Sequence, residues 1–225
     1  PGDDAAVLMA HPVAVSCDLS IEGVHFRRDW LSAEEIGWRA ASAALSDLAA
    51  MAARPVGILL SMAASGDDAS GFTERVVHGA IAAAGAVDAH LVGGDLTRSP
   101  GPLVLDVVVL GEAAHPLRRS GARPGDELWV TGRLGAPARA VRDWLAGGEP
   151  QPAARERYAH PIARTREALW LRQRADLTAG IDLSDGLAGD LPHLAAASRV
   201  GIEIDLRAVP AHEAVADAPE LALTC

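Results

Sequence analysis

The sequence predicts a mixed α/β protein of the α+β class that is built as two domains. Short runs rich in Val, Ile and Leu, typical of strands, are interspersed with longer Ala-rich segments that have helical spacing. Residues 112–126 are rich in Pro, Gly and Arg, which is typical of a linker. With 49% hydrophobic and 22% charged residues, the 225-residue chain can bury a sizeable core.

Five apolar runs are predicted to form strands, and two shorter segments are weaker candidates. The five runs are residues 13–17, 56–62, 103–110, 127–131 and 201–206, and the shorter candidates are 91–92 and 181–183. Each run is apolar and rich in Val, Ile or Leu, which suits a buried strand.

Five Ala-rich segments are predicted to form helices. They are residues 33–53, 69–84, 136–146, 161–174 and 187–197. Pro192 is expected to kink the last of these or to begin a second helix capped by Asp190. The linker then separates an N-terminal domain, residues 1–113, from a C-terminal domain, residues 114–225, and the second domain is expected to be incomplete.

The charge and composition exclude several classes of function. All 20 basic residues are Arg, so mechanisms that need a P-loop lysine or a Schiff base are excluded. The net charge of -10 argues against a nucleic-acid partner. No apolar run reaches the roughly 18–20 residues of a membrane span, and no leader suggests secretion. Cys17 and Cys225 form neither a disulfide framework nor a zinc site, so a cytoplasmic location is expected.

Aspartates recur where predicted strands end in Gly-containing loops. They are Asp3, Asp4, Asp18, Asp95, Asp182 and Asp185. Mg²⁺ prefers carboxylate, phosphate and water oxygens, so several such loops that converge would form a multi-metal nucleotide site. An Asp-Gly or Gly-Asp pair is also an ordinary turn, which is the alternative for each pair taken alone.

Asp47 differs because it lies inside a predicted helix and outside that helix's polar arc. The arc holds Arg39, Ser42 and Ser46. A carboxylate on an apolar face costs several kcal/mol unless it is paired or bound to metal. Asp47 is therefore interpreted either as a metal ligand or as the partner of a buried Arg or a cap.

Further residues could contact phosphate. Gly94 and Asp95 belong to a Gly-Gly-Asp segment that would let backbone approach an anion, although such pairs are also common turns. Ser184 precedes a predicted helix and could cap it or face an anion. Arg119 in the linker is a candidate phosphate contact, with surface solvation as the alternative. His25 is a lone loop histidine, and no nucleophile or catalytic base stands out.

Seven blocks in order resemble the thiamine-monophosphate kinase family over nearly the whole chain. They are GDDAAV at 2–7, SCD at 16–18, EGVHF at 22–26, LSDLAAM at 45–51, GGDLTR at 93–98, RSGARPGD at 119–126 and IDLSDGL at 181–187. The short blocks are weak alone, whereas EGVHF and LSDLAAM are specific. Cys17 departs from the family's usual Thr, and a thiol is a poor Mg²⁺ ligand.

The resemblance implies the two-domain fold shared with aminoimidazole ribonucleotide synthetase. It implies transfer of the ATP γ-phosphoryl group directly to thiamine monophosphate, with several Mg²⁺ ions and with ATP as co-substrate. It also implies a homodimer that pairs through its N-terminal domains.

The resemblance further implies roles for individual residues. The implied Mg²⁺ ligands are Asp4, Ser16, Asp18, Asp47, Asp95, Asp182 and Asp185. The implied ATP contacts are Gly94, Asp95, Arg119 and Ser184. His25 would contact thiamine monophosphate.

Two alternatives remain open at this point. One is another ATP-using member of the same superfamily with a different acceptor. Selenophosphate synthetase, for example, would need a reactive Cys and Lys near its N-terminus, and this sequence has no Lys. The other is a non-catalytic nucleotide-binding domain that kept the fold, against which the retained aspartates argue.

Overall fold

A five-stranded mixed sheet forms the N-terminal part of the computed structural model, which describes residues 3, 5–8, 12–66, 68 and 71–224. Its strands are β1 (Ala6–Leu8), β2 (Val13–Ile21), β3 (Arg54–Ala64), β4 (His90–Arg98) and β5 (Val104–Glu112). They lie in the order β1-β2-β5-β3-β4. Only the β3–β4 pair is parallel, and α2 supplies the crossover between these two strands.

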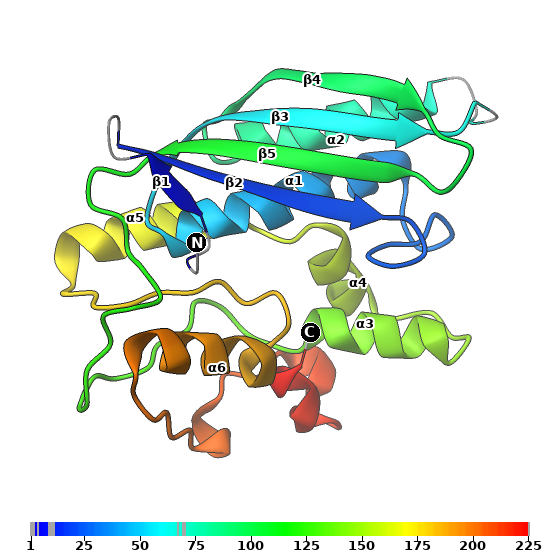
Figure 1. The fold of residues 1–225 in the computed structure, drawn as a ribbon. Helices are drawn as coiled ribbons and strands as arrows, with labels where there is room; N and C mark the ends of the chain where they lie inside the picture. The colour runs from blue at the N-terminus through cyan, green and yellow to red at the C-terminus, as the bar shows by residue number, and fades with distance from the viewer. Residues whose placement is uncertain (1–2, 4, 9–11, 67, 69–70, 225) are drawn as a thin grey trace.

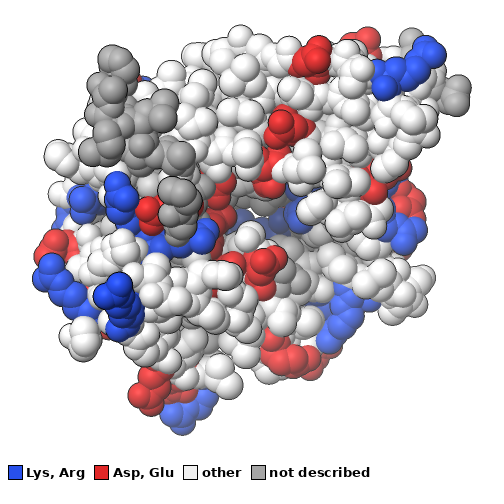
Figure 2. All heavy atoms as spheres, viewed as in Figure 1, with Lys and Arg blue, Asp and Glu red and all other residues white. Residues whose placement is uncertain are grey.

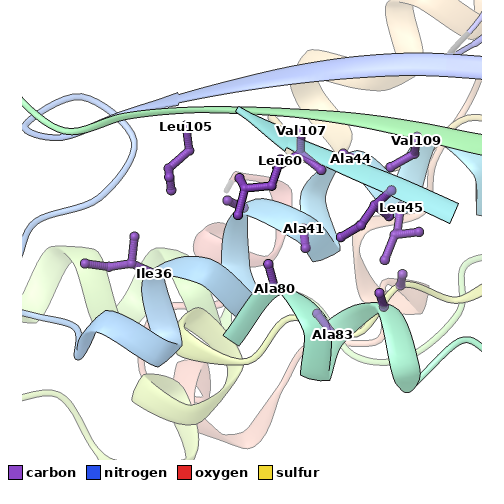
Figure 3. Packing of buried hydrophobic residues seen from close by; sticks show 14 of the residues in the cluster. Ile36, Ala41, Ala44, Leu45, Leu60, Ala80, Ala83, Leu105, Val107 and Val109 are labelled. Carbon is purple, nitrogen blue, oxygen red and sulfur yellow. The ribbon is translucent and has the colours of Figure 1, made fainter. Parts of the chain in front are cut away.

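Two helices, α1 (Ala33–Ala50) and α2 (Phe72–Gly85), cover one face of this sheet (Figure 1). Strand side chains alternate in burial, and Leu60, Val107 and Val109 are buried toward the helices (Figure 3). In the described part of the chain, no helix covers the opposite face, which is called the open face below.

Small residues let α1 and α2 pack closely. A Cβ added at Gly37 would lie 1.8 Å from the Val76 carbonyl oxygen, and one added at Gly79 would lie 1.9 Å from that of Glu34. Alanines fill the remaining contact, among them Ala41 on α1 (Figure 3). The alanine bias of the sequence is therefore a packing requirement of this layer.

The second region, below the sheet layer in Figure 1, is helical and irregular. It contains α3 (Ala136–Leu145), α4 (Pro152–Ala159), α5 (Thr165–Arg174), α6 (Leu187–Ser198) and three short 3₁₀ helices (Leu206–Ala208, Glu213–Val215 and Pro219–Leu223). Polar contacts tie it to α1. Arg155 forms an ion pair with Glu35 at 2.7 Å, and the Trp38 indole donates to the Pro161 carbonyl at 2.9 Å.

The strands predicted for the N-terminal region are confirmed, but β2 and β4 are longer than predicted, so Asp18 and Asp95 lie inside strands rather than in loops after them. The strands predicted for the second region are wrong. Residues 127–131, 181–183 and 201–205 form no strand, and Leu206 begins a 3₁₀ helix. Among the described residues this region has one isolated bridge, between Leu134 and Ala211. A strand needs a partner for its backbone hydrogen bonds, and these segments do not find one here.

The helix predictions need four corrections. The first helix ends at Ala50 rather than residue 53, because Ala52 takes a left-handed φ of 49°. The helix predicted for 161–174 begins at Thr165, and α4 was not predicted because its sequence has no apolar stripe. Pro192 lies inside α6 and does not start a second helix. No described helix is long and apolar enough to cross a membrane.

Candidate active site

Ser16 and Asp18 lie on the helix-covered face of β2. Ser16 is paired in register with Val109 of β5 and Asp18 with Val107, and both valines are buried beneath the helices. Cross-strand partners share a face of the sheet. The two polar side chains are therefore directed toward α1, and both are half-buried.

Asp47 of α1 meets this strand. The Ser16 hydroxyl donates a hydrogen bond to Asp47 Oδ2 at 2.5 Å. The carboxylate that lies outside the polar arc of its own helix thus faces a polar group on the sheet. Because Asp47 is only half-buried, its carboxylate borders solvent while it contacts β2.

The neighbouring residue on α1 extends the arrangement to the second region. The Ser46 hydroxyl donates to Asp182 Oδ2 at 2.8 Å. Asp182 belongs to the coil that precedes α6, so β2, α1 and this coil converge through two hydroxyl–carboxylate contacts. Ser16, Asp47 and Asp182, predicted separately from distant motifs, are brought together.

A buried acid organises the rest of that coil. Asp190 is 6% exposed, and its Oδ2 accepts the backbone N–H groups of Ser184 and Asp185, each at 2.9 Å. Burial raises the pKa of the Asp190 carboxyl, and the two amide bonds oppose that rise. At Gly186, with φ 84°, an added Cβ would lie 2.6 Å from the Thr224 backbone, so only glycine fits. The side chains of Ser184 and Asp185 are left exposed.

Asp18 lies in a region of mixed charge. Burial raises the pKa of its carboxyl, His25 and Arg39 lower it, and Asp106 adds to the rise. His25 follows β2, and its Nδ1 accepts the Ile21 backbone N–H at 3.1 Å. The imidazole therefore has Nε2 as its N–H donor, and the residue is exposed.

Asp95 is separated from these acids by the sheet. Cross-strand pairing places Asp95 of β4, Ser61 of β3, Asp106 of β5 and Leu19 of β2 in one row on the same face of the sheet. Because Leu19 and Asp18 are consecutive on β2, their side chains point to opposite faces, so this row lies on the open face. Within one copy of the described chain, Asp95 does not join Asp18.

Gly94 has a structural reason to be glycine. A Cβ there would lie 1.9 Å from the Leu60 carbonyl oxygen of the neighbouring strand. Close strand packing thus accounts for the residue type, whether or not a phosphate approaches it.

Arg119 lies in the linker, which is anchored at both of its sides. Its backbone N–H donates to Asp3 Oδ1 at 3.0 Å, and its carbonyl accepts the Ser198 hydroxyl at 2.7 Å. Asp3 therefore joins the start of the chain to the linker. Asp4 lies outside the described residues.

A hollow between the sheet layer and the second region has acidic side chains on both of its sides and basic ones within it (Figure 2). Two cavities lie elsewhere, one of about 260 Å³ beside Trp38 and Ile162 and one of about 420 Å³ beside Pro116 and Arg172. Across the described ranges, no three His, Cys, Asp or Glu side chains cluster closely enough to hold a metal ion by themselves.

Sequence reasoning missed the roles of Ser46 and Asp190. Ser46 could have been suspected, since it precedes Asp47 on the same helix. The sequence suggested Asp190 only as the cap of a second helix, whereas the residue lies inside α6 and its carboxylate is buried against two backbone amides.

Comparison with known proteins shows the family. Residues 2–113 match the family described as AIR synthase related protein, N-terminal domain, and residues 123–224 match the corresponding C-terminal domain. The thiamine-monophosphate kinases of Rhodopirellula baltica and Synechococcus elongatus are both 36% identical to the chain, over 95% and 93% of it. The chain belongs to the thiamine-monophosphate kinase family. It spans about two thirds of these relatives' length, 66% and 68%.

Solved structures of the thiamine-monophosphate kinase family have the same fold. A structure described as AaThiL complexed with AMPPCP and TMP has a TM-score of 0.91 and 30% identity, covering 100% of this chain and 76% of the other. The enzyme from Stenotrophomonas maltophilia K279a has a TM-score of 0.86 and 36% identity, covering 99% and 75%. The hydrogenase maturation protein HypE, at 20% identity and a TM-score of 0.77, shares the fold alone.

Proposed function

We propose that this protein transfers the γ-phosphoryl group of ATP to thiamine monophosphate, yielding thiamine diphosphate and ADP. The observation that carries the proposal is the convergence of Ser16, Asp47 and Asp182 beside Asp18. A structural relative described with AMPPCP, a non-hydrolysable ATP analogue, and TMP supports the choice of substrates.

Mg²⁺ fits the donor set of this site. The side chains present carboxylate and hydroxyl oxygens, the hard ligands that Mg²⁺ prefers, and no soft ligand stands among them. The residues that would hold the ions are Asp4, Ser16, Asp18, Asp47, Asp95, Asp182 and Asp185. When bound, the ions neutralise phosphate charge and align the reacting groups.

The remaining contacts divide between the two substrates. Gly94, Asp95, Arg119 and Ser184 would contact ATP. His25 would donate from Nε2 to the acceptor, because its Nδ1 already accepts a backbone N–H. A phosphate oxygen is a ready nucleophile, so direct transfer needs positioning rather than a strong base. This agrees with a site that has no lysine and no assigned catalytic base.

A homodimer would bring Asp95 to the site. Asp95 lies on the open face, and the sheet separates it from Asp18 of the same chain. The open face and the β4 edge expose Leu19, Val92 and Leu96, at 47%, 60% and 60%. Exposed apolar side chains on an uncovered sheet suit pairing with a second copy. Pairing through the N-terminal domains would supply Asp95 from the partner copy.

The division into domains and the location complete the proposal. We place the N-terminal metal, ATP-binding and dimerisation domain at residues 1–113 and the C-terminal domain at 114–225, close to the two family matches. We propose a cytoplasmic location, in agreement with the two widely spaced cysteines.

The experiment that tests the function measures ADP release with Mg-ATP and thiamine monophosphate. Parallel reactions contain thiamine, or no acceptor. ADP and thiamine diphosphate formed only with thiamine monophosphate are expected. Equal ADP release in all three reactions would contradict the assigned acceptor.

A mixing experiment tests the proposed homodimer. The Asp47→Asn and Asp95→Asn chains are each expected to be inactive. When the two are refolded together, a heterodimer has one site with both Asp47 and Asp95 intact, because each site would take these two residues from different copies. Recovery of roughly 25% of wild-type activity is expected for random pairing. Absence of recovery, with heterodimers confirmed by mass, would show that Asp95 does not act from the partner copy.

A further inference from the structure

Tyr158 of α4 contacts the turn that carries His25. Its side chain is buried, with 4% exposure, and its hydroxyl donates to the His25 backbone carbonyl at 3.2 Å. The contact crosses from the second region to the end of β2. The position of His25 therefore depends on a residue far away in sequence.

Tyr158 also holds Arg39 of α1. The Arg39 Nη1 donates to the Tyr158 carbonyl at 2.8 Å, and the guanidinium carbon lies 4.0 Å from the centre of the Tyr158 ring. Among the described residues this is the only hydrogen bond of the Arg39 side chain. A guanidinium has five N–H donors, so most of its donor capacity remains for a ligand.

An aromatic cluster makes this support rigid. Trp30 and Trp144 stack with ring centres 4.9 Å apart, and Tyr158 meets both rings edge-on at 6.2 and 5.2 Å. Arg155 bonds the Trp30 carbonyl at 3.3 Å while it pairs with Glu35. The turn after β2, α1 and α4 are thereby joined around Tyr158.

Arg39 and His25 both lie close enough to act on the Asp18 carboxylate. Arg39 is eight residues before Asp47 on α1, which is about 12 Å along the helix. It therefore lies beyond the Ser16–Asp47 contact, on the side where β2 leads to His25. A planar guanidinium is the group best suited to bind a phosphate through paired hydrogen bonds.

We propose that Arg39 binds the phosphate of the acceptor and that Tyr158 is a positioning residue that holds Arg39 and His25 together. The inference rests on the proposed function, and its ligand is the phosphomonoester of thiamine monophosphate. The competing interpretation is that Arg39 only balances the charge of Asp18.

The test compares the affinities of Arg39→Gln and wild-type full chains for thiamine monophosphate and for thiamine, by calorimetry. Arg39→Gln is expected to lower the affinity for thiamine monophosphate by about 10- to 100-fold, because a hydrogen-bonded charge pair is lost. The affinity for thiamine is expected to stay unchanged. Arg39→Lys is expected to recover part of the loss. Arg75→Gln on α2, an exposed arginine, is the control and is expected to change neither affinity.

Tyr158→Phe tests the positioning role without removing the ring. It deletes the bond to the His25 carbonyl and keeps the backbone carbonyl and ring that hold Arg39. The KM for thiamine monophosphate is expected to rise about 2- to 10-fold. The kcat and the KM for ATP are expected to stay the same.

Specific results would overturn the inference. Equal weakening of thiamine and thiamine monophosphate by Arg39→Gln would mean a loss of packing. A lower affinity for Mg-ATP, with the affinity for thiamine monophosphate unchanged, would mean that Arg39 only balances the charge of Asp18. If the wild-type chain forms ADP with thiamine monophosphate, and Arg39→Gln still prefers thiamine monophosphate to thiamine as strongly, then the role of Arg39 is wrong and the proposed function stands. A wild-type chain that does not bind thiamine monophosphate overturns the proposed function as well.

Discussion

The sheet layer and the second region hold their acidic residues in different ways. Asp18 and Asp47 lie on a strand and a helix that belong to a shared hydrophobic core. Asp182 and Asp185 lie in coil, where a seryl hydroxyl and a buried carboxylate hold them. Regular elements position side chains through packing, whereas coil needs dedicated polar contacts for each residue. The first half of the site should therefore be most sensitive to changes in packing, and the second half to loss of single hydrogen bonds.

The largest effect is expected from Gly37→Ala, which tests packing in the sheet layer. The new Cβ would lie 1.8 Å from the Val76 carbonyl, so α1 and α2 must separate. The free energy of unfolding is expected to fall by about 3 kcal/mol, measured by urea denaturation. Gly85→Ala on α2, with no atom within 4 Å of the new Cβ, is the control and is expected to be neutral or stabilising. Equal effects would show that the close helix contact does not limit stability.

Asp47→Asn tests the acid on the regular element. It removes a charge while keeping the shape that packs against β2, so stability should change little. Mg²⁺-dependent ATP binding is expected to weaken about 100-fold or more, measured by calorimetry. The control is Glu34→Gln, which changes a half-buried acid on the same helix and should leave ATP binding as in the wild type. Unchanged binding by Asp47→Asn would remove it from the metal ligands.

Glu35→Gln tests the junction between the two regions. Burial would raise the pKa of the Glu35 carboxyl, but Arg155 and Ser32 outweigh it, so that pKa lies below its ordinary value of 4.5. A lowered pKa means that the stabilisation is present above the unfolded pKa and is lost as pH falls through the folded pKa. The variant should lose about 2 kcal/mol at pH 7, and the difference should vanish in acid. A difference that persists below the folded pKa would contradict the assigned ion pair.

Asp190→Ala tests the second region and should have the smallest effect on stability. It leaves the N–H groups of Ser184 and Asp185 without their acceptor, but it also removes a buried charge. A loss of about 1 kcal/mol in unfolding free energy is expected. The coil that carries Ser184 and Asp185 should become less ordered. The free energy of ATP binding should therefore fall by more than the free energy of unfolding does.

Asp190→Asn is the matched control, since one side-chain oxygen accepts both backbone N–H groups and the Asn oxygen can do the same. Because burial raises the pKa of Asp190, the folded state favours the proton, and wild-type stability falls as pH rises through the folded pKa. The Asn variant should lack this decline. Identical pH profiles for Asp190→Asn and the wild type would show that the carboxylate is not responsible.

Much of the sheet layer could be predicted from local sequence. Strands β2, β3 and β5 contain the long apolar runs, and α1 carries the capping box of Ser32 and Glu35, so local preference and tertiary packing agree there. The three-residue strand β1 was not predicted. In the second region, local preference and tertiary packing disagree. Residues 127–131 and 201–206 have strand composition but no partner among the described residues, and composition cannot report a missing partner.

The candidate site was predictable as a set of residues but not as an arrangement. Ser16, Asp47 and Asp182 were predicted from separate motifs, and the structure brings them together through the Ser16–Asp47 and Ser46–Asp182 hydrogen bonds. The motif containing Asp95 gave no sign that the sheet separates it from Asp18, since that depends on strand register. Asp4 stays a prediction.

The sequence by itself determined the class of elements, the acidic and lysine-free chemistry, and the family. These follow from residue types and short-range spacing, which need no knowledge of distant contacts. Only the tertiary structure decided which faces the acids occupy, that Asp190 supports a loop, and that Tyr158 joins Arg39 to His25. Such contacts link residues more than a hundred positions apart or depend on burial, and both are properties of the folded chain alone.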